Sequence, residues 1–165
     1  MKIRKKDFIS KYLTILSLTI SVGCNQNIDY DALFNNYADI GLHCASLLDI
    51  NGEHMLFGEK FTGECLVFDD DLKVKIRLDS YLDGKLEGII LGFYPSGEKE
   101  FIGYRKNGEI NGKFIRFHKN GEIEISGQFN NGLYSGVFKY FNERGEITEE
   151  TSFNKSGEII KSKTF

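Results

Sequence analysis

The chain has 165 residues, of which 41% are hydrophobic and 13% aromatic, so it is long enough for one domain and too apolar to be disordered throughout. Its net charge of −3 hides a division, because residues 24–165 hold 16 of the 21 basic and 23 of the 24 acidic side chains. An acidic domain of this kind disfavours nucleic acid and anionic membrane surfaces as partners.

Residues 1–23 are organised like an export signal. Basic residues up to Lys11 precede an uncharged stretch from Tyr12 to Val22, which is too short to span a bilayer. The stretch ends in Val22-Gly23-Cys24, which resembles the lipobox of bacterial lipoproteins, where the cysteine is acylated and becomes the new N-terminus. The resemblance implies lipid attachment at Cys24 and a location in the bacterial cell envelope. The alternatives are a soluble secreted product cleaved after Gly23 and an uncleaved anchor.

Residues 24–46 are predicted to form a linker or a short helix. Asp29 is a candidate N-cap, and Tyr30, Leu33, Phe34 and Tyr37 would share one side of such a helix. Farther on, Cys44 and Cys65 either form a disulfide in an oxidising compartment or remain two free thiols. Their spacing alone does not decide between these alternatives, because a disulfide depends on the geometry of the fold.

Residues 47–160 are predicted to be a series of 24-residue repeats. Glycines at positions 88, 112 and 136 open three similar units, and each unit has a phenylalanine five residues later and a turn glycine nine residues later. The phenylalanines are Phe93, Phe117 and Phe141. The turn glycines, within and between the units, are Gly97, Gly108, Gly121, Gly132 and Gly145. Residues 161–165 are left as a C-terminal tail.

The spacing of the turns predicts an all-β fold. Asn-Gly pairs favour the positive φ of hairpin turns, and segments this short leave no room for the crossovers of a parallel sheet. We therefore expect an open antiparallel β-meander of repeated hairpins. In the first strand of each unit, Ile90, Phe114 and Phe138 fall on the side opposite the repeat phenylalanines. Either both faces of the sheet are partly covered or a β-bulge shifts the register.

The repeat resembles the MORN-type repeat of the variant found in the YwqK family. The resemblance rests on the unit Gly-x-x-x-x-Phe-x-x-x-Gly followed by a strand and Asn-Gly, and on the opening residues Asn51-Gly52-Glu53 and Phe61-Thr62-Gly63. It covers about residues 47–160. The aromatic pair that usually follows the leading glycine is complete only at Tyr140-Phe141. Members of the family are often described as antitoxin components, and the resemblance implies such a role here.

Catalytic, metal and cofactor chemistry finds little support in the residues. The three histidines are scattered, and His43, His54 and the cysteines lack the close ligand pair of a zinc site. Asp69-Asp70-Asp71 lacks the spaced oxygens of a calcium loop and is interpreted as a solvated turn. The repeat phenylalanines are most simply core residues, with an exposed aromatic groove as the alternative. We expect no catalytic residue, no metal and no cofactor.

These observations predict a non-catalytic binding or scaffolding module tethered to the cell envelope. Its partners would be the membrane, through the lipid anchor, and a protein or glycan of unknown identity, but not nucleic acid. An antitoxin or immunity role is the alternative implied by the family resemblance. Lipid-surface binding by the repeats is a further alternative, although the acidic charge of residues 24–165 opposes it.

Overall fold

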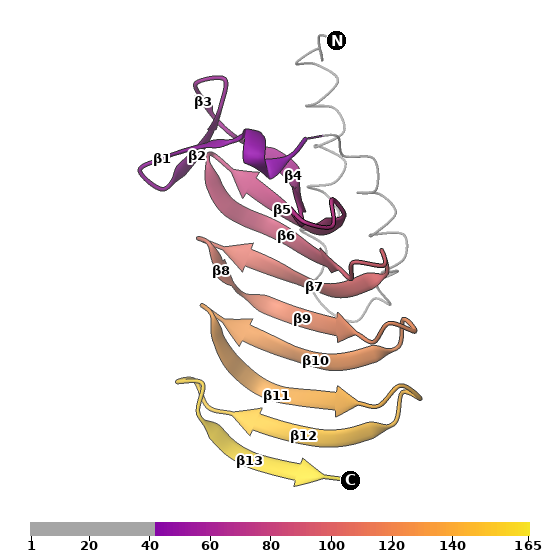
Figure 1. Ribbon diagram of the computed structural model, residues 1–165. Helices are drawn as coiled ribbons and strands as arrows, with labels where there is room; N and C mark the ends of the chain where they lie inside the picture. Colours follow the sequence, from indigo (N-terminus) through magenta and orange to yellow (C-terminus); the bar gives the residue numbers. More distant parts are fainter. Residues whose placement is uncertain (1–41) are drawn as a thin grey trace, which may run out of the picture. The chain divides into compact units, whose positions relative to one another are not determined.

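A computed structural model describes residues 42–165, which are almost entirely β-structure (Figure 1). One short 3-10 helix, η1 (Cys44–Ser46), precedes thirteen strands. The strands are β1 (Leu48–Ile50), β2 (Glu53–Leu56), β3 (Glu59–Lys60), β4 (Gly63–Phe68), β5 (Lys75–Leu82), β6 (Lys85–Phe93), β7 (Lys99–Lys106), β8 (Glu109–Ile110), β9 (Gly112–Phe117), β10 (Ile123–Asn130), β11 (Leu133–Phe141), β12 (Ile147–Phe153) and β13 (Ile159–Thr164). The predicted signal segment, Cys24 and the helix expected near Asp29 lie outside the described residues.

The strands from β4 to β13 form one antiparallel sheet whose spatial order follows the chain. The order is β13-β12-β11-β10-β9-β7-β6-β5-β4, with β8 pairing only with β7. Strands β1, β2 and β3 form a separate small antiparallel sheet. The main sheet is open, because its first and last strands do not pair with each other (Figure 1). The predicted open antiparallel meander is confirmed.

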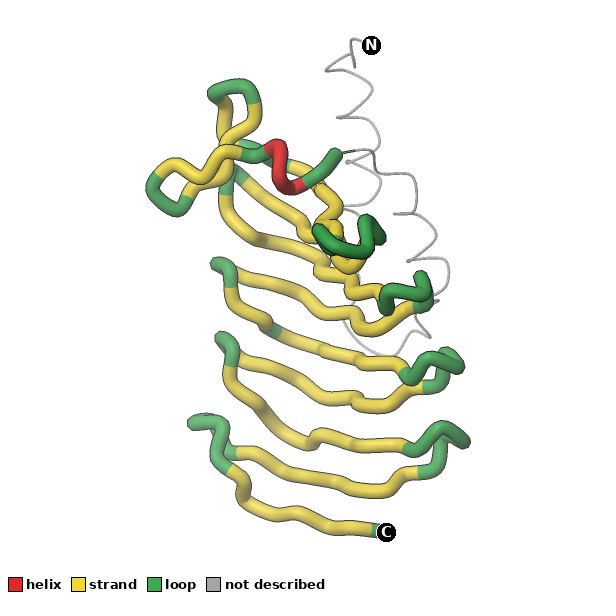
Figure 2. Tube along the Cα trace, in the orientation of Figure 1, coloured by secondary structure: helices red, strands yellow, loops and turns green. Residues whose placement is uncertain are grey.

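Two kinds of turn connect the strands, at opposite ends of the sheet (Figure 2). At one end, Asn107 and Gly108 both have positive φ, at 52° and 84°, as a two-residue hairpin turn requires. At the other end, the Tyr94 N–H donates to the Glu98 carbonyl and the Gly97 N–H donates to the Tyr94 carbonyl, so the loop has three residues and ends in glycine. Positive φ is found at all of the predicted turn glycines: Gly97, Gly108, Gly121, Gly132 and Gly145.

Each repeat also contains β-bulges. The register shifts where β7 joins β6, between Gly92 and Phe93, and equivalent shifts recur in the later units. A second irregularity falls near the leading glycines, such as Gly112 with a φ of 83°. Both explanations offered for the first strands therefore hold, because bulges are present and both faces of the sheet carry buried side chains.

The two faces of the main sheet are defined here by neighbouring residues of β6. The front face carries Ile90 and the back face carries Leu91, and both side chains are at most 2% exposed. The back-face row is aliphatic in the first half of the sheet and polar in the second, where Ser126 and Lys139 continue it. The aliphatic residues of this row are Leu66, Leu78, Leu91, Ile102 and Ile115.

The first edge of the sheet is covered by the segment that precedes it. His43 forms a parallel bridge with Leu66 of β4, and the Leu66 N–H donates to the Leu42 carbonyl. Cys44 and Cys65 form a disulfide with a Cα–Cα separation of 5.0 Å. The half-cystine Cys65 is completely buried in a small core with Leu47, Phe61 and Tyr81. The pairing that the sequence left open is thus present, and it ties the segment to the edge strand.

The last strand extends the sheet beyond the predicted end of the repeats. Residues 161–165 were expected to be a tail, but β13 runs to Thr164 and pairs with β12 through partners such as Ser162 with Thr151. All six residues of β13 are exposed. The strand is therefore held mainly by its backbone hydrogen bonds. Because these bonds require no alternation of apolar residues, the sequence contains no pattern that predicts the strand.

Candidate binding face

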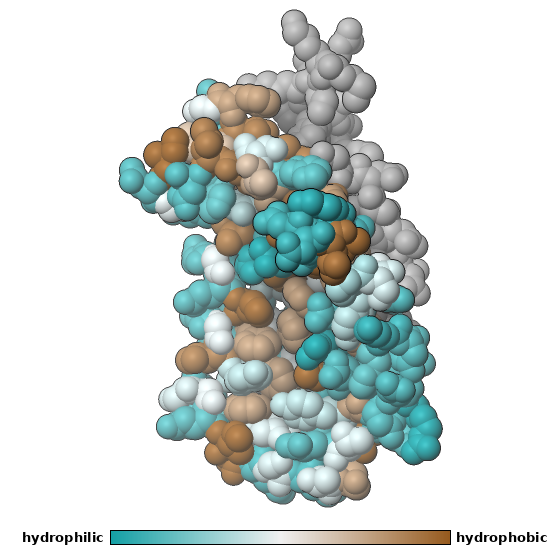
Figure 3. Space-filling view, viewed as in Figure 1, coloured by the Kyte–Doolittle hydropathy of each residue, from teal (hydrophilic) through white to brown (hydrophobic). Residues whose placement is uncertain are grey.

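A row of cross-strand neighbours runs along the middle of the front face. It begins at Cys65, which pairs with Asp79, and Asp79 in turn pairs with Ile90. The row continues through Gly103, Phe114, Gly127, Phe138 and Thr151. Figure 3 shows this face, with apolar and small residues gathered along the middle of the sheet and hydrophilic residues along its borders. The row brings together residues from eight different strands.

Six aromatic side chains of the front face form a continuous cluster, which we call the aromatic cluster. Its members are Phe101, Phe114, Phe129, Tyr134, Phe138 and Phe153. Neighbouring ring centroids lie 4.8–5.9 Å apart, and most pairs meet edge to face. Such contacts stabilise aromatic pairs by about 0.5–1.5 kcal/mol beyond the burial of their area.

Glycines leave the space that these rings occupy. A Cβ atom at Gly92 would overlap the ring of Phe101, and one at Gly127 would overlap the ring of Phe138. At Gly103 a Cβ would lie 3.2 Å from Cδ2 of Phe114, which is closer than ordinary van der Waals contact, so the ring would have to shift. The rings of Phe101 and Phe138 therefore lie directly over glycines of the neighbouring strands.

The aromatic cluster is only partly removed from solvent. Phe138 at its centre is 1% exposed, whereas Tyr134 is 45% exposed, and the remaining members are half-buried. An interior hydrophobic core would cover all of these rings. The cluster thus combines a packed base with an accessible aromatic surface, which is the usual composition of a recognition site.

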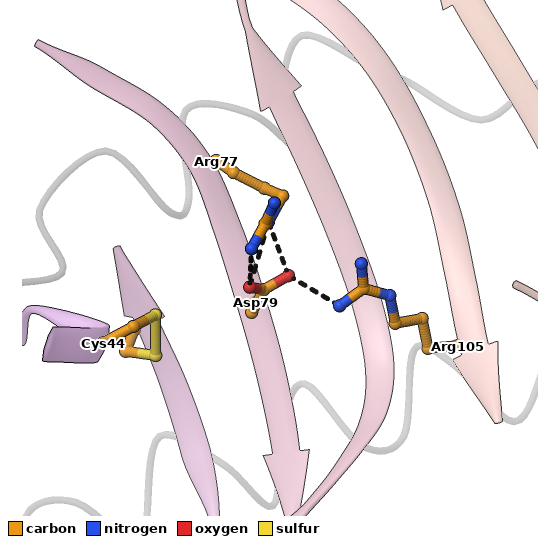
Figure 4. A network of polar contacts seen from close by, with 5 residues as sticks. Cys44, Arg77, Asp79 and Arg105 are labelled. Carbon is orange, nitrogen blue, oxygen red and sulfur yellow. Dashed lines mark hydrogen bonds and ion pairs between the residues drawn. A yellow bond between two sulfur atoms is a disulfide. The ribbon is translucent and has the colours of Figure 1, made fainter. Parts of the chain in front are cut away.

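Toward β5, the cluster gives way to a charged group, which we call the Arg–Asp–Arg cluster (Figure 4). Both carboxylate oxygens of Asp79 lie 3.0 Å from Nε of Arg77, and Nη2 of Arg77 lies 2.8 Å from Oδ2. From β7, Nη1 of Arg105 donates to Oδ1 at 3.1 Å. The carboxylate of Asp79 is buried, the side chain of Arg105 is 18% exposed and that of Arg77 is 38% exposed.

The Arg–Asp–Arg cluster occupies positions that are apolar in the next repeat. Counting 24 residues along the chain, the sequence positions of Arg77 and Asp79 correspond to Phe101 and Gly103. The position of Arg105 likewise corresponds to Phe129. At these positions, two guanidinium groups and a carboxylate replace side chains that belong to the pattern of the aromatic cluster in the following repeat.

Two electrostatic effects accompany these side chains. Burial raises the pKa of the Tyr81 phenol, and the nearby charge of Asp79 raises it further, so that the neutral phenol is favoured beside the Arg–Asp–Arg cluster. At the far end of the face, hydrogen bonds from Thr151 and Ser162 lower the pKa of the Glu149 carboxyl. The face therefore runs from two arginines at β5–β7 to an ionised carboxylate at β12.

The repeat phenylalanines predicted as core residues lie on the opposite, back face. Phe93 and Phe117 are 5% and 2% exposed, and Phe141 is half-buried. The ammonium groups of Lys75 and Lys99 lie over the first two rings, at 4.1 and 5.0 Å from their centroids. The aromatic surface of the molecule is instead built by a different set of residues on the front face, which sequence reasoning missed.

Side chains at the three-residue turns connect successive repeats. The Tyr94 hydroxyl donates to the Phe117 carbonyl at 2.8 Å, and Nε2 of His118 hydrogen-bonds the Phe141 carbonyl at 2.9 Å. The two contacts are equivalent, 24 residues apart. The signal for them is present in the sequence, because side chains with a polar group, Tyr94, His118 and Asn142, recur at this position.

Residues 42–165 also bear on metal binding and on membrane crossing. No three His, Cys, Asp or Glu side chains of this region come together as a metal site requires. Within the same region, no helix is long and apolar enough to cross a bilayer. Oδ1 of Asp69 accepts hydrogen bonds from the N–H groups of Asp71 and Leu72, as expected for a turn.

Comparison with known proteins gives no family. No family model matches the chain, and no curated protein matches it either. A crystal structure of TarM aligns with 87% of this chain and 25% of its own, at 11% identity and a TM-score of 0.40. An S. aureus TarM mutant in complex with fondaparinux, α-GlcNAc-glycerol and UDP aligns with 95% of this chain and 26% of its own, at 10% identity and a TM-score of 0.29. The chain spans about a quarter of the length of these structures.

Proposed function

We propose that this protein is a non-catalytic binding module that is exported and held at a bacterial cell envelope by a lipid on Cys24. The front face of its sheet contacts the partner. The observation that supports this assignment most directly is the aromatic cluster, which is packed at Phe138 and accessible at Tyr134. Exposed aromatic surface of this kind is costly to leave in water and is characteristic of recognition surfaces.

Export is supported by two separate observations. The N-terminal 24 residues resemble a lipoprotein signal, as described above, and the disulfide between Cys44 and Cys65 belongs to an oxidising compartment. The repeat of 24 residues agrees with the resemblance to YwqK-type MORN repeats, which we retain as a proposal. An antitoxin role has no support among the described residues beyond that resemblance.

The anchoring part of the proposal is tested at Cys24. The Cys24→Ala variant should lose label from a fatty-acid probe and should leave the membrane fraction, because one thioether-linked glyceride and one amide-linked chain provide the membrane affinity. Labelling and fractionation of the wild type and a Cys44→Ala/Cys65→Ala variant serve as controls. Membrane retention of the Cys24→Ala protein would exclude lipid anchoring at this residue.

The binding part is tested on the front face. A photo-crosslinking residue placed at Tyr134 should form adducts with cell-envelope material, whereas the same residue at Lys155, in the exposed turn after β12, should not. The adducts should be competed by added unlabelled protein. If positions 134 and 155 give the same products, the front face is not a specific binding surface.

A further inference from the structure

We propose that the Arg–Asp–Arg cluster binds an oxyanion carried by the ligand of the front face, and that this ligand is an acidic glycan. The inference rests on the proposed function and names the class of ligand. It begins from the geometry in Figure 4, where Asp79 lies between two guanidinium groups that approach it from β5 and β7.

The charges of the cluster do not cancel. Asp79 carries one negative charge and the two arginines remain positive at all relevant pH values, so the cluster keeps a net positive charge. Arg77 alone already contacts both carboxylate oxygens, and Arg105 adds a single contact through Nη1. Most of the five N–H donors of Arg105 therefore have no acceptor among the described residues, although its side chain is partly accessible.

Stability gives little reason for this arrangement. Replacing a buried ion pair or triad by packed hydrophobic side chains is often neutral or stabilising. The next repeat of this chain makes that replacement, with Phe101 and Gly103 at the positions that correspond to Arg77 and Asp79. A local departure from an otherwise repeated packing pattern is expected where a site has a function.

Asp79 explains how two arginines are held side by side. Its buried carboxylate fixes both guanidinium groups on the front face, where like charges would otherwise move apart. Two oriented guanidinium groups match the paired oxygens of a carboxylate or a phosphate. Because residues 24–165 are acidic overall, the positive charge of the Arg–Asp–Arg cluster is local and is not part of a general basic surface.

The sheet favours a sugar chain over a peptide as the ligand. Extended peptides are usually recognised by main-chain hydrogen bonds at a free strand edge, but on the front face the main-chain groups are already paired within the sheet. Phe129 of β10 and Phe153 of β12 are half-buried and lie two strands apart, about 9.5 Å, which is close to the length of a disaccharide. A glycan lying across the strands would therefore place successive sugar faces on the aromatic cluster and an acidic group at Arg77 and Arg105.

The test is calorimetric titration of the purified chain with oligogalacturonate, an acidic glycan, and with cellohexaose, a neutral one. The wild type should bind oligogalacturonate more tightly, and Arg105→Gln should weaken that binding at least tenfold with little effect on cellohexaose. Arg144→Gln removes the same charge from an exposed turn, where Arg144 pairs with Glu146, and should bind like the wild type. Circular dichroism establishes that each variant is folded, and Arg77→Gln replaces Arg105→Gln if the latter is not.

The remaining outcomes would each contradict a different part of the proposal. Equal binding of the two glycans, unchanged by either arginine substitution, would remove the oxyanion site and leave the aromatic face as a glycan-binding surface. Binding of an oligoglutamate peptide in preference to both glycans would exclude the glycan. If the folded Tyr134→Ala and Arg105→Gln variants both bind oligogalacturonate as tightly as the wild type does, the front face itself is not the binding surface. The proposed function then fails as well.

Discussion

At the residue scale, the front face depends on glycines, which have no side chain, as much as on its aromatic residues. Gly127 faces the ring of Phe138, which is 1% exposed, so a methyl group there forces a buried ring to move. We predict that Gly127→Ala lowers the free energy of unfolding by about 1–3 kcal/mol, as overpacking of a core does. Gly103→Ala should cost less, because its Cβ meets the half-buried Phe114 at 3.2 Å. Urea unfolding of both variants measures the difference, and equal losses would contradict the assignment.

Sequence reasoning could find the turn glycines but not the glycines under the rings. An Asn-Gly pair indicates a hairpin turn by itself, because both residues favour positive φ and no residue elsewhere in the chain is needed to recognise the turn. Gly127 carries no such signal, since the ring that needs its space comes from another strand. The Arg–Asp–Arg cluster was missed for the same reason: Asp79 and Arg105 are 26 residues apart and meet only through the register of β5, β6 and β7.

At the element scale, the first edge of the sheet is held by the disulfide. Cys44 and Cys65 are 21 residues apart, and closing a loop of this length stabilises a fold by about 3 kcal/mol in the chain-entropy view. We predict that Cys44→Ala/Cys65→Ala unfolds at lower urea concentration and that dithiothreitol lowers the wild-type midpoint to a similar value. Thiol titration of the unfolded wild type provides the control. A wild-type midpoint that is unaffected by reduction would show that the bridge contributes nothing.

The strands themselves were predicted well because the signals that delimit them are local. Turn glycines at regular intervals set the number of strands and their antiparallel order. The two turn types and strand β13 were not predicted, and the bulges were one of two alternatives, since all of these features depend on hydrogen bonds between neighbouring strands. In β13, Lys161, Ser162 and Lys163 are exposed and follow no apolar alternation, so only their pairing with β12 reveals the strand.

At the scale of the whole molecule, the sheet is an array in which each repeat contacts mainly the next. The turn glycines contribute to this coupling, because the Gly108 N–H donates to the Leu86 carbonyl and the Gly132 N–H donates to the Ile110 carbonyl. At the opposite end, Tyr94 and His118 make the equivalent side-chain contacts. Because such an array does not close on itself, its stability is approximately the sum of the stabilities of its repeats and of the interfaces between them.

Removing one repeat is the most direct test of this account, because the front face and its aromatic cluster depend on interchangeable units. Deletion of residues 112–135 joins Asn111 to Gly136, which then occupies the place of Gly112. We predict a shorter protein that keeps a β-type circular dichroism spectrum and unfolds in one cooperative thermal transition at a lower temperature. A closed sheet would not tolerate the loss, since its strand number is fixed. A deletion variant without any folded transition would contradict the open array.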